Sequence, residues 1–217
     1  MRDDRIRYFA ENMGRLSRRD RIFLNNPVIM QGLGLAPIIV PATTVQNALI
    51  LAVAVALLLT PTRIIATLIG RRMNIGMRAI LYSVVSAGLF FGVMYIMDNY
   101  LFWQALNNVG IFLPLLVLEP LIIKRYERQQ RERISTSFKK GIITTVGFCL
   151  VLFIVATARE LLGYGTFYGI EVFKSGVLPI AAMPAGGLII MGLVAALWRG
   201  IVFNFKKRIS MGVKELQ

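Results

Sequence analysis

The chain has one cysteine, Cys149, and no histidine in 217 residues. A disulfide needs two thiols, and most metal and haem sites use histidine or several cysteines. The composition therefore excludes a disulfide within the chain and a histidine-ligated metal or haem. Cys149 stands alone in an apolar stretch, where a thiol usually behaves as a small buried apolar group.

Long polar stretches are also missing, since the longest is the N-terminal segment of about 25 residues. Hydrophobic residues make up 56% of the chain, and they come in blocks of roughly 17 to 22, long enough to cross a bilayer as helices. The sequence therefore predicts an all-α membrane protein with several spans. Any water-soluble chemistry would come from partner proteins.

Acidic residues are few, 11 against 25 basic ones, which gives a net charge of +14. The basic excess lies in residues 1–25, 63–78, 124–140 and 199–217, and the connections between these segments carry little net charge. Cytoplasmic loops of membrane proteins are enriched in Lys and Arg. We therefore expect six spans in a bacterial-type inner membrane with both termini in the cytoplasm, and no nucleic-acid partner.

The expected spans cover about residues 27–41, 46–60, 76–97, 109–123, 142–162 and 177–198. Asn26 and Pro27 suit the N-cap and first turn of the first span, and Pro61 is expected to end the second. The transmembrane domain, 25–200, is preceded by a cytoplasmic segment, 1–24, and followed by a basic cytoplasmic tail, 201–217. Segment 1–24 has the spacing of an amphipathic surface helix, and a solvated basic tail fits equally well.

The first and fourth spans resemble each other, because a proline interrupts each. Aligning Ala36-Pro37 with Glu119-Pro120 superposes two apolar stretches 83 residues apart. The order of one broken and two continuous spans then occurs twice. Since three spans per half reverse the orientation of the second half, we expect two inverted three-helix repeats, about 25–97 and 108–198, with broken first and fourth helices and a site near the membrane midplane.

Glu119 lies inside an expected span, next to the proline of the fourth helix. A carboxylate in hydrocarbon is costly unless it is paired, protonated or solvated. Two interpretations stay open. Glu119 is either a functional carboxylate, or one that joins helices or reaches Lys124 and Arg125.

A second group of candidates surrounds the first interruption. Gly32 and Gly34 either allow close packing or let the chain unwind. The polar side chains either hydrogen-bond between helices or help freed carbonyls to coordinate a cation or bind a solute; they are Gln31, Thr43, Thr44 and Asn47. At the end of the fifth span, Arg159-Glu160 is interpreted as an end-of-helix ion pair.

Four motifs give the chain a resemblance to a known family. They are Asn26-Pro27-Val28 with Gln31-Gly32-Leu33-Gly34-Leu35-Ala36-Pro37, Phe112-Leu113-Pro114-Leu115, Arg159-Glu160-Leu161-Leu162-Gly163-Tyr164-Gly165-Thr166, and Met183-Pro184-Ala185-Gly186-Gly187. Together they resemble, over most of the chain, the six-span integral subunits of the Rnf and Nqr ion-pumping redox complexes. The nearest type is the E-type component of Rnf or the D-type component of Nqr.

The resemblance implies that two such subunits of opposite topology pair and share a [2Fe-2S] cluster at their interface. Each would offer one cysteine from each broken helix, and the cluster would relay electrons across the membrane, coupled to Na⁺ or H⁺ transport. The ligand positions correspond to Ala36 and Pro120 in this chain. Since thiolates hold such a cluster, we expect this chain to bind no cofactor by itself.

We therefore predict a membrane subunit of an Rnf/Nqr-like redox-driven ion-translocating electron transport complex that cannot itself ligate the cluster. It would be at most a non-catalytic subunit of this translocase. Its expected partners are a paralogous six-helix subunit, other redox subunits and membrane lipid. The alternative is a cluster-less paralogue that transports a small solute or an ion, with dimerisation completing the pathway.

Overall fold

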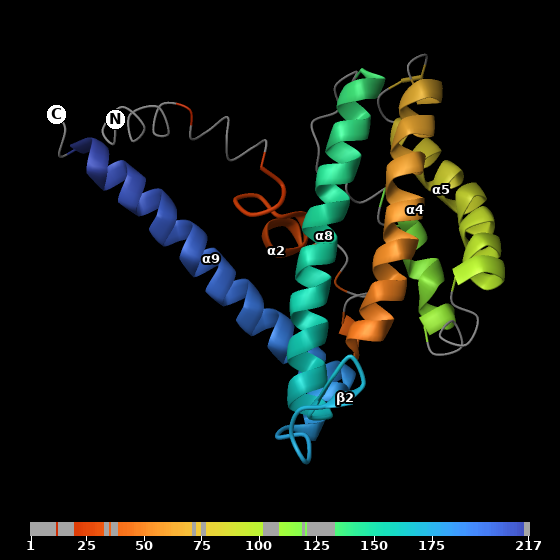
Figure 1. Cartoon of the computed structure of the whole chain (residues 1–217). Helices are drawn as coiled ribbons and strands as arrows, with labels where there is room; N and C mark the ends of the chain where they lie inside the picture. Colours follow the sequence, from red (N-terminus) through yellow and green to blue (C-terminus); the bar gives the residue numbers. More distant parts are fainter. Residues whose placement is uncertain are drawn as a thin grey trace.

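A computed structural model describes residues 12, 20–32, 35, 39–70, 73–74, 77–101, 109–118, 120 and 133–214. These residues are mostly helical, with one short hairpin near one end (Figure 1). The elements are α2 (Pro27–Gln31), α4 (Val45–Ile69), α5 (Met77–Ile96), the π-helix η2 (Met97–Leu101), the 3-10 helix η3 (Gly110–Leu118), α8 (Ile134–Gly163), β1 (Thr166–Phe167), β2 (Ile170–Glu171), the 3-10 helix η4 (Pro179–Ala182) and α9 (Pro184–Lys214).

Four helical stretches of the described residues are long and apolar enough to cross a membrane. They are Val45–Ile69, Ile80–Asn99, Ile134–Gly163 and Pro184–Met211, and they correspond to the second, third, fifth and sixth expected spans. At about 1.5 Å of rise per residue, each is at least as long as the hydrocarbon core is thick, about 30 Å. A mostly helical membrane protein is thus confirmed.

The first and fourth expected spans contain only short helices in the part of the chain that the structure describes. Helix α2 has five residues and η3 has nine. Neither is long enough to cross a bilayer, and Pro114 lies inside η3. The arrangement of six spans as two inverted repeats therefore stays a prediction.

The helix ends differ from the expected ones. Helix α4 continues through Pro61 to Ile69, so the prediction that Pro61 ends this span is wrong. A proline removes one main-chain donor, which membrane helices tolerate where neighbours and Thr side chains compensate. Helix α9 begins at Pro184 rather than near residue 177, and it continues to Lys214. Charged residues can continue a helix beyond its apolar part, so hydropathy does not mark its end.

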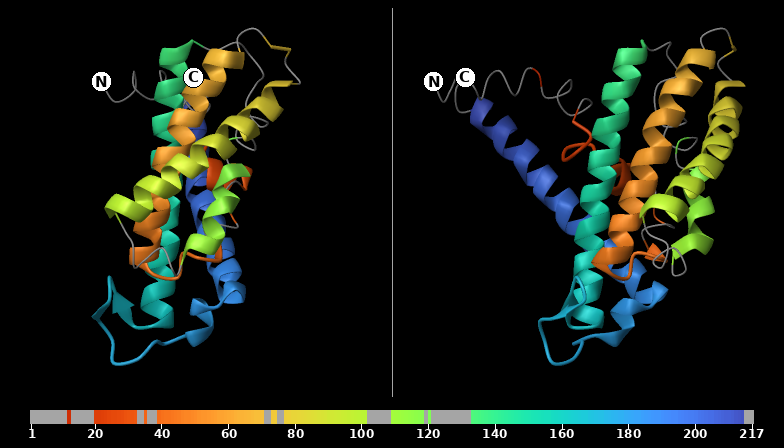
Figure 2. Two further views of the ribbon diagram at one scale, coloured as in Figure 1. Left: turned by 90° about the vertical axis from the view of Figure 1, so that its right-hand side faces the viewer. Right: turned by 45° about the vertical axis from the view of Figure 1, so that its right-hand side comes forward.

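Helices α4 and α8 pack antiparallel along their whole lengths (Figures 1 and 2). Four contacts mark the register: Val45 with Glu160, Ala52 with Cys149, Thr60 with Thr145 and Thr67 with Ser137. The middle of the interface is apolar, with Leu51, Val55 and Val151 almost fully buried. This pair is the core to which the other helices attach.

The remaining long helices flank this pair. Helix α5 packs against α4, where the Tyr82 and Thr67 hydroxyls are 3.2 Å apart. Helix α9 contacts α8 near the hairpin and then diverges from it (Figure 2). Trp198 is buried and donates from Nε1 to the Phe23 carbonyl over 2.9 Å. Most of segment 1–24 lies outside the described residues.

The start of α2 was predicted correctly. Asn26 is its N-cap, Pro27 occupies its first turn, and the Asn26 side-chain oxygen accepts the Val28 amide over 2.9 Å. The Asn26 Nδ2 group donates to the Gly147 carbonyl in α8 over 2.8 Å. The cap therefore also fastens α2 to the core.

We expect Asn26→Ala to destabilise the protein by about 2 kcal/mol, because it removes a helix cap and a buried interhelical hydrogen bond. Thermal unfolding in mild detergent measures the effect. Asn26→Asp keeps the cap and loses the donor to Gly147, so its stability should lie between that of the unsubstituted protein and that of Asn26→Ala. Asn99→Ala is the control, since the exposed Asn99 side chain donates only to the Tyr95 carbonyl on its own helix turn. Equal stability of Asn26→Ala and Asn99→Ala would contradict the assignment.

Candidate functional site

The first interruption starts at Gly32, where α2 ends. Gly32 has φ of 69°, a left-handed conformation that suits glycine, and its amide caps the carbonyls of Pro27 and Val28. Among the described residues, an added Cβ would meet no atom closer than Leu35 Cδ1 at 3.8 Å. The left-handed φ ends α2 at Gly32, and both interpretations of Gly32 stay predictions. Gln31 is the last residue of α2, and Gly34 lies outside the described residues.

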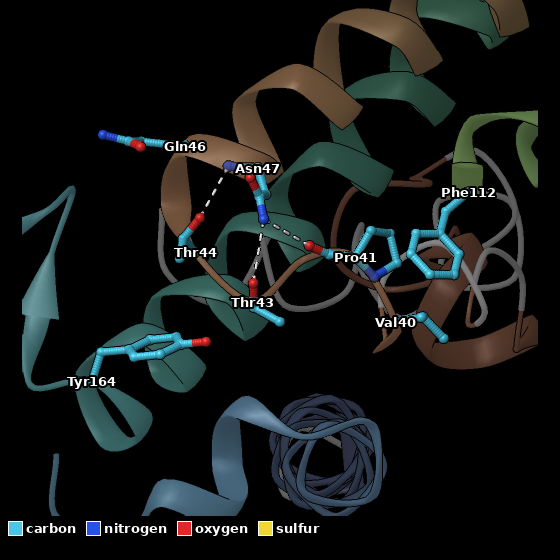
Figure 3. Close-up of a pocket in the computed structure, with 8 residues that line it drawn as sticks. All are labelled: Val40, Pro41, Thr43, Thr44, Gln46, Asn47, Phe112 and Tyr164. Atoms are coloured by element: carbon cyan, nitrogen blue, oxygen red, sulfur yellow. Dashed lines mark hydrogen bonds between the residues drawn. The ribbon is translucent and has the colours of Figure 1, made fainter. Parts of the chain in front are cut away.

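A cavity of about 370 Å³ lies where the chain turns from this interruption into α4 (Figure 3). The described residues that line it are all uncharged and include polar, aromatic and two apolar side chains; they are Val40, Pro41, Thr43, Thr44, Gln46, Asn47, Phe112 and Tyr164. Thr43 and Thr44 were candidate site residues, and the structure brings them together here. Phe112 from η3 places the fourth expected span beside the first interruption.

Local hydrogen bonds hold this wall in shape. Thr44 is the N-cap of α4 and accepts the Asn47 amide over 3.2 Å. The Asn47 Nδ2 group donates to the Pro41 carbonyl and to Thr43 Oγ1, both over 3.2 Å (Figure 3). These bonds all lie between residues 41 and 47, so the hydrogen bonding of Thr43, Thr44 and Asn47 is local in this structure. The uncharged lining suits a neutral polar solute, or a cation held by oxygens.

Arg159 lies behind this wall and is fully buried. Its three guanidinium nitrogens donate five hydrogen bonds, all to main-chain carbonyls; the acceptors are Ile39, Ala42, Ala181, Ala182 and Met183. A guanidinium carries five N–H donors, so every one has a partner. The acceptors come from the first interruption and from the turn before α9.

Glu160, the next residue, uses different partners. Its Oε2 accepts the Val45 amide at the start of α4 over 2.6 Å, and its Oε1 accepts Thr166 Oγ1 over 3.1 Å and the Gly169 amide over 2.9 Å. The expected Arg159-Glu160 ion pair is therefore wrong. Consecutive helix residues point about 100° apart, so the two side chains leave α8 in different directions. The sequence indicated that Arg159 and Glu160 matter only because two ionisable residues stand at the end of a membrane helix; it did not indicate their partners.

Of the other candidate residues, Glu119 and Ala36 lie outside the described residues, whereas Pro120 is helical and buried. Cys149 lies in the α4–α8 interface, where its thiol is 4.0 Å from the Ala52 carbonyl. Among the described residues, no group of His, Cys, Asp and Glu side chains is arranged to hold a metal ion.

The sequence of this region matches that of known proteins. The family model described as "Rnf-Nqr subunit, membrane protein" matches residues 17–195. The chain belongs to the Rnf-Nqr subunit family. Membership confirms the resemblance that the four motifs indicated, and the matched range contains the interruption, the cavity wall and the Arg159-Glu160 pair.

Three relatives of this Rnf-Nqr family member are named as the E-type component of an ion-translocating oxidoreductase complex. The Shewanella oneidensis protein is 31% identical over 203 residues, covering 86% of this chain and 87% of the relative. The Shewanella piezotolerans protein is 32% identical over 200 residues, with coverage of 85% and 86%. The Shewanella frigidimarina protein is 33% identical over 192 residues, with coverage of 81% and 83%.

We expect Glu160→Ala to lower the stability of this Rnf-Nqr family member by about 3 kcal/mol, since it leaves three donors without their charged acceptor. Glu160→Gln should have a smaller effect, because the amide keeps one acceptor oxygen. Thermal unfolding in mild detergent distinguishes the variants. Glu171→Ala is the matched control, because Glu171 is exposed in β2 of the same hairpin. A Glu160→Ala protein as stable as Glu171→Ala would refute the role.

Proposed function

We propose that the chain is a membrane subunit of an ion-translocating oxidoreductase complex. The observation that carries the proposal is the family match over residues 17–195, together with relatives named for such a complex that align over more than four fifths of the chain. In this role α2 and η3 belong to the broken first and fourth helices of a six-span inverted repeat. The chain itself performs no catalysis.

The placement of basic side chains supports both termini on the cytoplasmic side of an inner membrane. Lys139 and Lys140 lie near the start of α8, and Lys206 and Lys207 near the end of α9. The starting end of α8 and the final end of α9 lie on the same side of the molecule, opposite the hairpin (Figure 1). By the positive-inside rule this side is cytoplasmic.

The residues of this chain do not fit the [2Fe-2S] cluster that the resemblance implies. The corresponding positions are Ala36 and Pro120, which have no thiol. Cys149 occupies the α4–α8 interface, in a different helix, and faces the Ala52 carbonyl. We therefore propose that the chain contributes no cluster ligand, and that any cofactor near it is held by other subunits, including a paralogous six-helix partner.

We expect the tagged chain, isolated from its own membranes in gentle detergent, to bring down the other subunits of such a complex. Mass spectrometry identifies the partners, and iron analysis of the separated chain should find no cluster iron. An unrelated tagged protein with several membrane spans is the control for co-solubilised proteins. Recovery of the chain alone, or with one paralogue and no redox subunit, would overturn complex membership.

We further propose that Glu119 provides the carboxylate for ion or proton coupling, with the segment around Gln31, Gly32 and Gly34 and with Thr43 and Thr44 as the facing groups. The support is the position of Glu119 beside Pro120 in an otherwise apolar stretch.

Glu119→Gln keeps the size of the side chain and removes its charge. We expect it to reduce ion transport by the purified, reconstituted complex at least about tenfold without loss of assembly. An increase of about 1.4 kcal/mol in the activation free energy of the coupling step is enough for a tenfold slower rate. Glu127→Gln, in the basic segment that follows, is the control. Unchanged transport in Glu119→Gln would refute the coupling role.

A second candidate function is small-solute transport by a cluster-less paralogue. The observation that favours it is the uncharged polar cavity of about 370 Å³ at the start of α4, which lies within the size range of small-molecule sites. This function predicts uptake by liposomes that contain the chain without redox subunits, and complex membership predicts none.

A further inference from the structure

Two segments of main chain that lie about 140 residues apart in sequence converge on one side chain. Ile39 and Ala42 belong to the first interruption, and Ala181 to Met183 form the turn that precedes α9. Arg159 Nε donates to the Ala181 carbonyl over 3.0 Å. Its Nη1 donates to the carbonyls of Ile39 and Ala42, and its Nη2 to those of Ala182 and Met183.

These five carbonyls form the kind of oxygen cage that unwound membrane segments offer to a cation. In this chain the cation is covalently attached. No carboxylate of the described residues shares it, because the Glu160 oxygens face Val45, Thr166 and Gly169. The end of α8 adds favourable dipoles, since a cation near a helix C-terminus is stabilised.

Space around the cage is closed by α9. A Cβ added to Gly187, in the first turn of α9, would lie 3.0 Å from Arg159 Cζ and 3.0 Å from the Ile39 carbonyl oxygen. A side chain at this position would require the guanidinium and the Ile39 carbonyl to shift by a few tenths of an ångström. The first interruption, α8 and α9 therefore meet at the guanidinium.

We propose that Arg159 is a positioning residue, a tethered cation that fills a main-chain carbonyl cage and holds residues 39–42 and 181–183 as one unit. The consequence concerns the cavity. Val40 and Pro41 line it, and they lie between the two carbonyls that Nη1 holds. The shape of the cavity is thus fixed by α8 and by the entry to α9, and a ligand that moves the wall must also move α9. This proposal is independent of complex membership.

Chemical rescue tests the cage. We expect Arg159→Ala to lower the unfolding temperature of the chain in its native membranes by about 10 °C, and millimolar methylguanidinium to restore a large part of this loss by entering the vacated cage. Arg199→Ala is the matched control, because the exposed Arg199 donates to the single carbonyl of Ile29. It should show a small loss and no rescue. A destabilised Arg159→Ala protein that methylguanidinium does not restore would overturn the proposal.

A double-mutant cycle tests whether Arg159 stabilises the protein through the carbonyl cage or through an ion pair with Glu160. The variants are Arg159→Met, Glu160→Gln and the two together. If the two charges mainly compensated each other, the double variant would be more stable than the sum of the single effects predicts. We expect additive losses, because the two side chains have separate partners. Strong mutual rescue would overturn the cage.

A labelling experiment reports on the wall itself and does not need Arg159→Ala to fold. Val40→Cys is made in a Cys149→Ala background, so that the chain carries one thiol. Arg159→Lys keeps the charge with three donors in place of five, and we expect it to speed the reaction of the thiol at position 40 with a polar maleimide several-fold. Arg199→Lys should leave the rate unchanged. Equal rates with and without Arg159→Lys would show that the guanidinium does not hold the wall.

Discussion

An interrupted membrane segment leaves main-chain carbonyls without their helical donors, and in hydrocarbon no water replaces them. In this protein one guanidinium donates to freed carbonyls of the first interruption and of the turn before α9. All five N–H groups of Arg159 are used, and all five acceptors are main-chain oxygens. The route of the first interruption, the wall of the cavity and the starting point of α9 all depend on this arrangement.

The neighbouring carboxylate stabilises a different junction. Glu160 accepts the Val45 amide at the N-terminus of α4, where an anion is favoured, and it also holds the hairpin through Thr166 and Gly169. The two opposite charges are adjacent in the chain, but each is stabilised by its own hydrogen-bond partners. The α4–α8 pair therefore has a charged end, an apolar middle and an end where hydroxyls such as Thr67 and Ser137 meet.

The features that could be predicted from the sequence are those that depend on neighbours in the chain. The cap by Asn26 involves the next three residues, and the long apolar helices follow from composition. The partners of Arg159 could not be predicted, because they lie 22 to 120 residues away and are main-chain atoms with no side-chain signature. Pro61 shows the same limit, since its tolerance within α4 depends on packing. For the site, only the position of Thr43 and Thr44 beside the first interruption was foreseeable.

The five acceptors of the carbonyl cage are synthesised at different times relative to Arg159. Arg159 is made after Ile39 and Ala42 but before residues 181–183, so the last three acceptors appear only when the chain is nearly complete. At ordinary rates of synthesis this interval is about one to five seconds. During that time only two of its five final acceptors, the carbonyls of Ile39 and Ala42, have been made. The turn before α9 thus completes the set of oxygens around the guanidinium, and a chain that ends before residue 181 lacks three of them.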